Sequence, residues 1–194
     1  MIKNLVLKNR SYRKFYQNEV IELSTLKELI DLARLSASAA NLQPLKYIIS
    51  NGSVENESIF KTLGWAGYLK DWNGPIEGEK PSAYIVMLND LSISKKPSLD
   101  SGISAQSMLL GAVEKGLGGC MIGNINKVEL TSVLNLDENF AIDLVIALGK
   151  PKETVVIDEK SLPTDIKYWR DEKDVHHVPK RSLDEIILGN NTEK

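Results

Sequence analysis

The chain has 194 residues, of which 42% are hydrophobic and 26% are charged, a composition typical of a globular protein with a core of its own. Its 24 Lys and Arg residues nearly balance its 26 Asp and Glu residues, so the net charge of -2 excludes a protein that binds polyanions over its whole surface. Cys120 is the single cysteine, which excludes an intramolecular disulfide, and with only His176 and His177 beside it no metal site is expected. The N-terminal sequence lacks the apolar run of a signal peptide, and nowhere do about 18 apolar residues stand together. We therefore expect one domain over residues 1–194, in the cytoplasm and without a membrane span.

Apolar residues at helical spacing predict several helices. The first covers 24–36, with Ser24 as its N-cap. The second covers 100–115 and ends at a glycine, which is a common helix C-cap. Shorter helices are expected at 127–135 and from Ser182 onward. The residues expected on the buried faces of the first two are Leu26, Leu29, Ile30, Ala33, Ala105, Met108, Leu109, Ala112 and Val113.

Short apolar runs rich in Ile, Val and Tyr predict strands at 45–50, 83–88 and 142–149. Their lengths suit buried strands better than helices. Helices and strands are interspersed without strict alternation, so we expect an α/β or α+β fold with one central sheet.

The segment 64–82, GWAGYLKDWNGPIEGEKPS, holds two of the three Trp residues together with four Gly and two Pro. Two interpretations stay open. A long loop with large aromatic residues is typical of a lid over a binding site, whereas the same aromatic residues can simply fasten a surface excursion to the core.

Common nucleotide and hydrolase motifs are absent. The glycine-rich stretch 116–123, GLGGCMIG, lacks the spacing G-x-G-x-x-G and follows a predicted helix, so it is not a dinucleotide-binding fingerprint. Gly149 and Lys150 lack the rest of a P-loop, and no G-x-S-x-G nucleophile motif occurs. Nothing marks a nucleophile for a hydrolytic triad.

The first eighteen residues carry basic side chains and no acidic one: Lys3, Lys8, Arg10, Arg13 and Lys14. A solvated basic arm is the simple explanation. On a helical turn, however, Arg10 and Arg13 of the R-S-x-R sequence would share a face, and with Ser11 they would suit a phosphate. Nucleic acid would require a longer basic surface with interleaved aromatic residues.

Four blocks of sequence, in order, resemble the FMN-dependent nitroreductase family. NRSYRKF at 9–15 is similar to the family's R-R-S-x-R-x-F, and SASAANLQPLKYII at 36–49 to its A-P-S-A-x-N-x-Q-P-W-x-F. The stretch from 100 to 123 resembles D-x-G-x-A-x-Q-N-L-L-L-A-A-x-x-x-G-L-G-x-x-x-I-G. IALGKPKE at 146–153 resembles V-A-L-G-x-P-x-E.

The resemblance implies a fold and an assembly. It implies an α+β fold with a mixed, mostly antiparallel central sheet flanked by helices. It also implies a homodimer with FMN at the subunit interface, in which a C-terminal arm, residues 168–194, wraps the partner. Within this single FMN-binding domain, 64–82 would be the active-site lid.

The resemblance also implies roles for individual residues. Arg10 and Ser11 would hold the FMN phosphate, Arg13 would lie near the pyrimidine edge of the flavin, and Ser38 and Asn41 would contact the flavin of the partner. Further cofactor-binding candidates are Gln43, Gln106, Gly118, Gly119, Ile122, Gly123, Lys180 and Arg181, and the lid candidates are Trp65, Tyr68 and Trp72.

Several of these candidates have structural alternatives. Ser38 and Asn41 could cap the helix at 24–36, and a buried glutamine could simply satisfy backbone groups. The pair Gly118-Gly119 could form a tight connection from a helix to a strand.

The implied activity is that of an FMN oxidoreductase that uses NADH or NADPH to reduce nitroaromatic, quinone or related acceptors by a ping-pong two-electron mechanism. The flavin N5 would carry the chemistry, so no catalytic side chain is expected. The alternative is a non-catalytic flavin-binding or sensing protein on the same fold. We expect His176 and His177 in the arm that wraps the partner, and Cys120 as a small buried hydrophobic residue.

Overall fold

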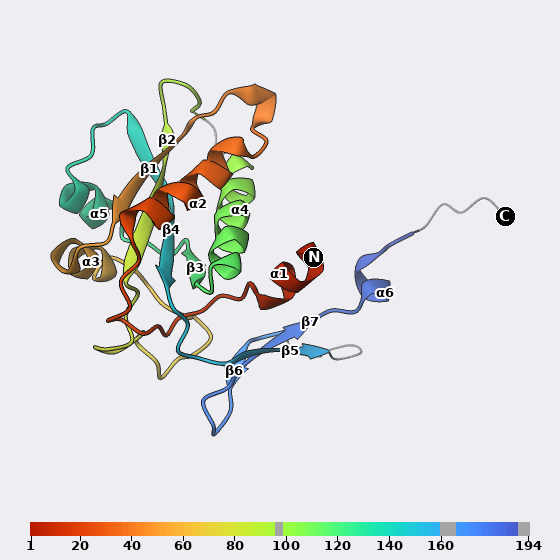
Figure 1. Cartoon of the computed structure of the whole chain (residues 1–194). Coiled ribbons are helices and arrows are strands. Elements are labelled where there is room, and N and C mark those ends of the chain that lie inside the picture. Colours follow the sequence, from red (N-terminus) through yellow and green to blue (C-terminus); the bar gives the residue numbers. More distant parts are fainter. Residues whose placement is uncertain (96–98, 160–165, 190–194) are drawn as a thin grey trace.

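In a computed structural model of the chain, which describes residues 1–95, 99–159 and 166–189, a four-stranded sheet forms the centre. Each neighbouring pair of its strands is antiparallel. In spatial order the strands are β1 (Leu45–Ser50), β2 (Ala83–Asp90), β4 (Phe140–Gly149) and β3 (Gly118–Ile122) (Figure 1). The three predicted strands are therefore confirmed, and β3 is an addition.

Helices cover both faces of this sheet. Ile85 and Met87 of β2 point into a cluster with α2 (Leu23–Leu35) and α4 (Asp100–Glu114). The alternate residues of β2 point to the opposite face, where they pack with α3 (Ser53–Phe60) and α5 (Lys127–Leu134) (Figure 1). Because both faces are buried, β2 is a continuous apolar run rather than an alternating one.

The helix predictions are confirmed with one correction. The helix α2 begins at Leu23, and its N-cap is Glu22, which makes no side-chain capping bond. The expected N-cap Ser24 was wrong, because Ser24 lies inside the first turn. The short α6 (Leu183–Ile186) does have the expected kind of cap, since the Ser182 hydroxyl accepts a bond from the Glu185 N–H.

Three helical elements were not predicted from the sequence: α1 (Ile2–Lys8), α3 and the 3₁₀ turn η1 (Ala39–Asn41). Helix α1 buries none of its residues within the chain. It lies against α4 without burying any of its apolar residues there, which is why a search for a buried helical face misses it.

The R-S-x-R segment is extended, so the expected helical turn was wrong. Helix α1 ends at Lys8, and Ser11 then forms a parallel bridge with Gly119 of β3. Four residues on, Phe15 is fully buried and bridges Pro151. Backbone pairing thus attaches this segment to the edge of the sheet, and the parallel bridge makes the otherwise antiparallel sheet mixed.

The expected glycine turn at Gly118-Gly119 was also wrong, because both residues lie in β3. The chain turns earlier, at Gly116, whose φ of +74° favours glycine. A Cβ on Gly119 would lie 2.5 Å from the Ala147 carbonyl oxygen, and one on Gly118 would lie 2.5 Å from the Tyr12 ring. Close packing therefore explains these two glycines.

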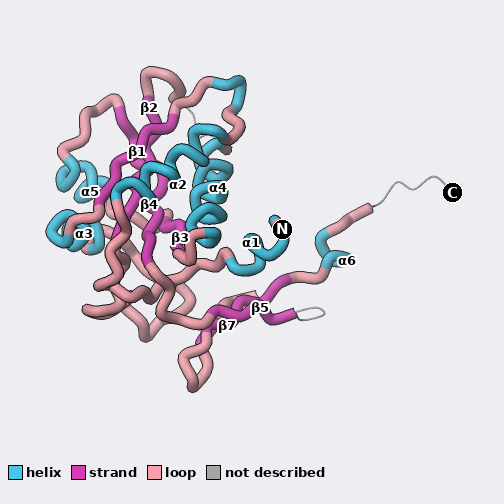
Figure 2. The backbone as a smooth tube through the Cα atoms, viewed as in Figure 1, coloured by secondary structure: helices cyan, strands magenta, loops and turns pink. Residues whose placement is uncertain are grey.

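A second, small sheet follows the central one. Its order is β5 (Val155–Glu159), β7 (His176–Lys180) and β6 (Trp169–Arg170), with β5 and β7 parallel. Beyond β7 the chain leads through α6 away from the rest of the subunit (Figure 2). The last part of the arm expected at 168–194, residues 190–194, lies outside the described residues. None of the described helices is both long and apolar enough to cross a membrane.

Candidate functional site

The N-terminal segment, α4, β3 and the small C-terminal sheet meet around a cavity of about 360 Å³, which we call the basic cavity. Its basic side chains come from both ends of the chain. It is lined by Asn9, Arg10, Ser11, Arg13, Gln106, Leu109, Gly119, Met121, Tyr168, His176, Val178 and Lys180.

Arg13 is held firmly in the wall of this cavity. Its side chain is largely buried, and its Nη1 donates to the Ser11 carbonyl at 3.2 Å and lies 3.1 Å from His176 Nε2. The guanidinium carbon lies 4.7 Å from the centre of the Tyr168 ring, within the range of a cation–π contact. The Arg13 backbone N–H donates to the Glu153 carboxylate. The charged group is thus fixed in place by uncharged partners.

Arg10 has fewer hydrogen-bond partners within the protein than Arg13. Its Nη2 donates to the Val6 carbonyl at 2.7 Å, while its buried Nε has no hydrogen-bond partner. Burial lowers the pKa of this guanidinium from its usual value, because the charged form has lost part of its hydration. A guanidinium has five N–H donors, so Arg10 keeps unused donors at the cavity.

Six of the predicted cofactor residues line the basic cavity: Arg10, Ser11, Arg13, Gln106, Gly119 and Lys180. The amide oxygen of Gln106 accepts a bond from the Asn9 side chain at 3.3 Å. No ion pair involves Lys180 within the part of the chain that the structure describes.

Four other candidates lie elsewhere in this subunit. Ile122 is buried in the core between the sheet and α5, and Gly118 packs against Tyr12. Gly123 is exposed with no atom near its Cβ position. Arg181 forms an ion pair with Glu185 of α6.

Ser38 and Gln43 line a separate cavity of about 240 Å³ beside the start of α4. The Ser38 hydroxyl donates to Asp100 at 2.5 Å and accepts from the Gln43 backbone N–H. Ser38 and Asn41 were the alternative candidates for capping the C-terminus of α2. Ser36 takes this role instead, because its hydroxyl donates to the Leu32 carbonyl. Asn41 is exposed and, like Gln43, has a positive φ of about 50°.

The 64–82 loop is fastened at two places, and its role as a lid stays a prediction. Trp65 packs on Phe60 with ring centroids 5.7 Å apart and thereby fastens the loop to the core. Tyr68 and Trp72 instead reach the small sheet, where Tyr68 packs on Tyr168 and Trp72 lies under Arg170, 4.5 Å from its guanidinium carbon.

His176 and Tyr168 belong to the cavity, although the motifs did not mark either residue. His176 is buried in β7, and its pKa is lowered to about 4 by burial first and then by the charge of Arg13. His177 faces the other way, and bonds to Asp158 and Asp171 raise its pKa. The only local signal was the aromatic run at 168–169 followed by two histidines.

Cys120 is buried in the core between the sheet and α5, which confirms the expected small buried residue. Burial raises the pKa of its thiol. The reactive thiolate is therefore disfavoured.

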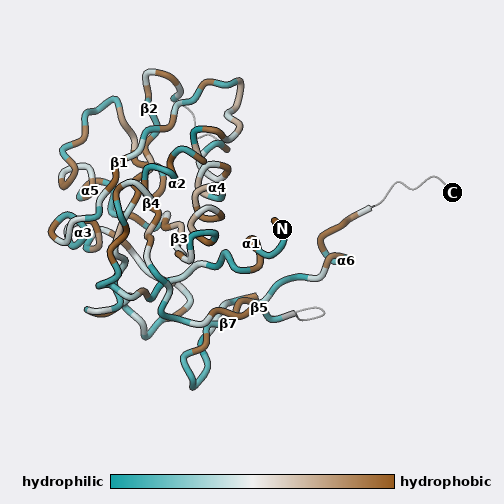
Figure 3. Tube along the Cα trace, viewed as in Figure 1, coloured by the Kyte–Doolittle hydropathy of each residue, from teal (hydrophilic) through white to brown (hydrophobic). Residues whose placement is uncertain are grey.

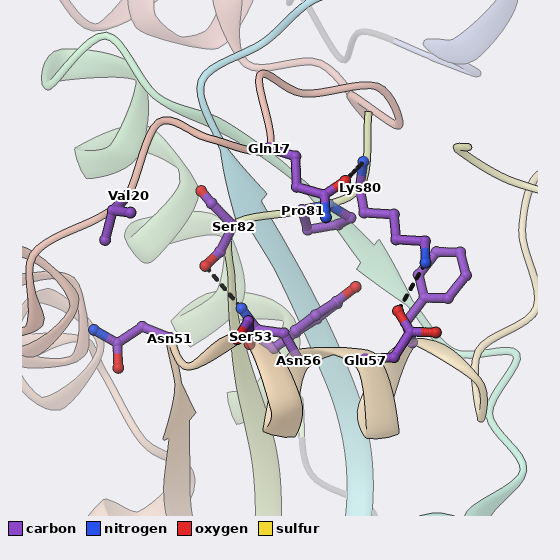
Figure 4. Close-up of a pocket in the computed structure, with 11 residues that line it drawn as sticks. Gln17, Val20, Asn51, Ser53, Asn56, Glu57, Lys80, Pro81 and Ser82 are labelled. Carbon is purple, nitrogen blue, oxygen red and sulfur yellow. Dashed lines mark hydrogen bonds and ion pairs between the residues drawn. The ribbon is translucent and has the colours of Figure 1, made fainter. Parts of the chain in front are cut away.

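A further cavity, of about 150 Å³, lies between α3 and the start of β2 (Figure 4). Its polar groups bond mostly to one another. Lys80 pairs with Glu57 at 2.7 Å, and the Asn56 amide donates to the Ser82 carbonyl (Figure 4). None of the predicted cofactor or lid residues lines it.

The chain was compared with known proteins. A family model described as the nitroreductase family matches residues 6–71 and 79–150. MhqN of Bacillus subtilis (strain 168), which bears the name of an NAD(P)H nitroreductase, is 24% identical over 77% of this chain and 88% of its own length. An FMN-dependent nitroreductase from Clostridium difficile R20291 is 20% identical, with a TM-score of 0.65 over 99% of this chain and 100% of that one. The NADPH:FMN oxidoreductase of Vibrio harveyi, solved with NAD+, is 24% identical, with a TM-score of 0.63 over 84% of this chain and 74% of that one.

At these identities the two solved structures show that the fold is shared. The family model goes further, because its two matched segments cover most of the chain and contain the R-S-x-R segment, the 36–49 block and the whole of α4 and β3. The family inferred from the four sequence blocks is thereby confirmed. The chain belongs to the nitroreductase family.

Proposed function

We propose that the protein is an NAD(P)H-dependent FMN oxidoreductase that reduces nitroaromatic, quinone or related acceptors. One observation carries this proposal: the basic cavity joins three cationic side chains from the two ends of the chain, Arg10, Arg13 and Lys180. Family membership and the two flavin-linked structural neighbours agree with it.

The residues present fit the phosphate end of FMN. Arg10 has a buried Nε–H without a partner, and Ser11 and Lys180 add a hydroxyl and an ammonium at the same cavity. Forked guanidinium donors and an ammonium are the groups that proteins use for phosphate. These three residues would therefore hold the phosphate, and Arg181 would join them only if it left Glu185.

Arg13 fits the flavin ring rather than the phosphate, because it is fixed by Tyr168 and His176 in the cavity wall. A positive charge placed near the pyrimidine edge favours the negative charge that the ring system gains on reduction. Leu109, Met121 and Val178 supply apolar surface around the same cavity, and Gln106 an amide.

A second copy of the chain would complete the site. Ser38 and Asn41 lie away from the basic cavity of their own subunit, as residues that contact the partner's flavin would. Apolar residues, brown in Figure 3, occur in α1, in α6 and directly after α6, and their side chains are exposed. They are Ile2, Val6, Leu7, Leu183, Ile186, Ile187 and Leu188. An exposed apolar arm of this kind requires a partner surface, so we assign residues 168–194 to dimerisation.

In this proposal the flavin, when bound, supplies the two-electron chemistry, with donor and acceptor using the site in turn. The side chains of the protein bind the FMN and orient it. Arg10, Ser11 and Lys180 fix the phosphate, and Arg13 presents its charge. Tyr68 and Trp72 of the 64–82 loop lie on the small sheet beside the cavity and would limit access by acceptors and water.

The test begins with purified protein reconstituted with FMN. We expect a yellow protein with a flavin absorption spectrum that oxidises NADH or NADPH when a nitroaromatic or quinone is added. Protein that stays colourless after reconstitution would contradict the proposal. Tight FMN binding without acceptor-dependent oxidation would instead favour the sensing alternative.

The assembly has its own test. We expect a particle of about 43 kDa, twice the 21.6 kDa of one chain, at all moderate dilutions. A monomer that binds one FMN per chain would contradict the shared site.

A further inference from the structure

His176 makes an uncommon contact with Arg13. Its Nε2 lies 3.1 Å from Nη1 of the guanidinium. A guanidinium can only donate, so Nε2 must be the acceptor and carry no proton. The ring is therefore neutral with its proton on Nδ1, in agreement with its pKa of about 4.

Two features of the His176 ring lower the stability of the folded chain. With Nε2 used as an acceptor, the Nδ1–H donor is buried without a partner. The ring also lies near the positive charges of Arg13 and Arg170, which lower its pKa. A buried donor without a partner destabilises the fold. An apolar residue of similar size would remove that donor, but it would also remove the acceptor of Arg13 Nη1, which would keep only its bond to the Ser11 carbonyl. Because the bond to Arg13 is offset by the unpaired Nδ1–H, stability alone gives little reason for a histidine at this position.

The surroundings of Arg13 suggest what the histidine does. Glu153, the nearby buried carboxylate, accepts from the backbone N–H groups of Arg13 and Lys14 and pairs with Arg170. None of the ion pairs among the described residues includes the Arg13 guanidinium. Its side-chain partners are the His176 ring, the Ser11 carbonyl and the Tyr168 face, all uncharged.

We propose that His176 is a positioning residue that holds the Arg13 guanidinium at the basic cavity and leaves its positive charge uncompensated. A carboxylate at position 176 would hold the guanidinium equally well but would neutralise it. An apolar residue at position 176 would leave the guanidinium charged but would no longer hold it in place. This inference rests on the proposed function, since the charge matters for a flavin that becomes more negative on reduction.

The test compares His176→Gln, His176→Leu and His176→Glu with wild type, using the reduction potential of bound FMN and the FMN dissociation constant. Gln can place an acceptor near the position of Nε2, so we expect its potential and affinity close to those of wild type. For Leu we expect a lower potential and a loss of about 3- to 10-fold in FMN affinity. For Glu we expect a lower potential because the Arg13 charge is neutralised.

Unfolding by urea separates this role from a structural one. In His176→Leu the loss of the Arg13 acceptor is offset by the loss of the unpaired Nδ1–H, so its urea midpoint should stay close to that of wild type. The matched control is His177→Gln, which alters the neighbouring residue outside the cavity and should leave the potential unchanged. An unchanged potential in both His176→Leu and His176→Glu would overturn the inference while the proposed function stood.

Nitrogen NMR of the apo protein tests the contact without flavin. We expect the His176 ring to be in the Nδ1–H form and to stay neutral at pH 5.5, and Arg13→Leu to raise its pKa. A ring protonated on Nε2 would overturn the inference. Wild-type protein that binds no FMN would contradict the proposed function. The NMR spectrum of the His176 ring would then be the remaining test of its contact with Arg13.

Discussion

Tyr68 and Tyr168, which are 100 residues apart in sequence, pack with ring centroids 4.9 Å apart, and the Tyr168 hydroxyl lies 3.4 Å from the Tyr68 backbone nitrogen. Tyr168 also touches Arg13 and His176 on the wall of the basic cavity. Tyr168 thus connects the 64–82 loop to the wall of the cavity. Trp65, at the start of the same loop, packs on the core instead.

This difference predicts that two aromatic residues of one loop respond differently to substitution. Tyr68→Ala removes a ring that is 54% exposed, so we expect little loss of stability but a several-fold change in the KM for the acceptor. Trp65→Ala removes a ring packed on Phe60 and should lower the free energy of unfolding by about 2–4 kcal/mol. Steady-state kinetics and urea unfolding measure the two effects. A large loss of FMN in Tyr68→Ala would instead indicate a role in cofactor binding.

The phosphate assignment predicts a selective effect of Arg10→Ala. Removing this guanidinium should weaken FMN by roughly tenfold or more, because a charge-assisted bond contributes about 1.5–3 kcal/mol. Riboflavin, which lacks the phosphate, should bind the variant as it binds wild type. Lys61→Ala, which removes an exposed charge directly after α3 and outside the basic cavity, is the control for net charge. Equal binding of FMN and riboflavin by wild type would show that no phosphate site exists.

Much of the fold could be predicted because its signals are local. The apolar run of β2 and the stripe of α4 each specify an element without reference to the rest of the chain. The elements that were missed depend on distant partners. Gly118 and Gly119 have the composition of a turn, but they lie in a strand because Tyr12 and Leu109 pack where side chains would be. The R-S-x-R segment forms no helical turn because its backbone bridges Gly119 of β3, 108 residues further along the chain.

The candidate site divides in the same way. Family motifs could indicate Arg10, Arg13 and Gln106, since these residues lie within the similar blocks. His176 meets Arg13 across 163 residues, and the pairing of β7 with its neighbouring strands holds it there. No spacing rule encodes such a contact.

The two kinds of glycine in this region predict opposite outcomes. Gly119→Ala would bring a Cβ within 2.5 Å of the Ala147 carbonyl oxygen and 2.7 Å of Leu109, so we expect a loss of about 1–3 kcal/mol in the free energy of unfolding. Gly123→Ala has open space around its Cβ and an ordinary φ, so its stability should stay within about 0.5 kcal/mol of wild type. Urea titration of both variants in parallel checks this. If Gly123→Ala nevertheless lost FMN, the backbone there would approach the cofactor.

The adjacent histidines predict opposite dependences of stability on pH. The pKa of His176 is lowered to about 4 in the folded chain, so the unfolded chain binds its proton first on acidification, and stability falls as the pH drops from 6.5 toward 4. The pKa of His177 is raised by Asp158 and Asp171, so its contribution is complete below pH 6.5 and is lost as the pH rises through the raised pKa.

Urea unfolding between pH 4.5 and 8.5 separates the two histidines. His176→Gln should flatten the acid side of the stability profile, by on the order of 3 kcal/mol in total if the whole shift is realised. His177→Gln should lower stability below pH 6.5 relative to pH 8.5 by about 1 kcal/mol or less, because its carboxylate partners are partly exposed to water. The comparison uses the slopes and not the absolute values, since each substitution also removes a ring contact. Parallel profiles for the two variants would contradict the assignment of a neutral His176 beside a charged His177.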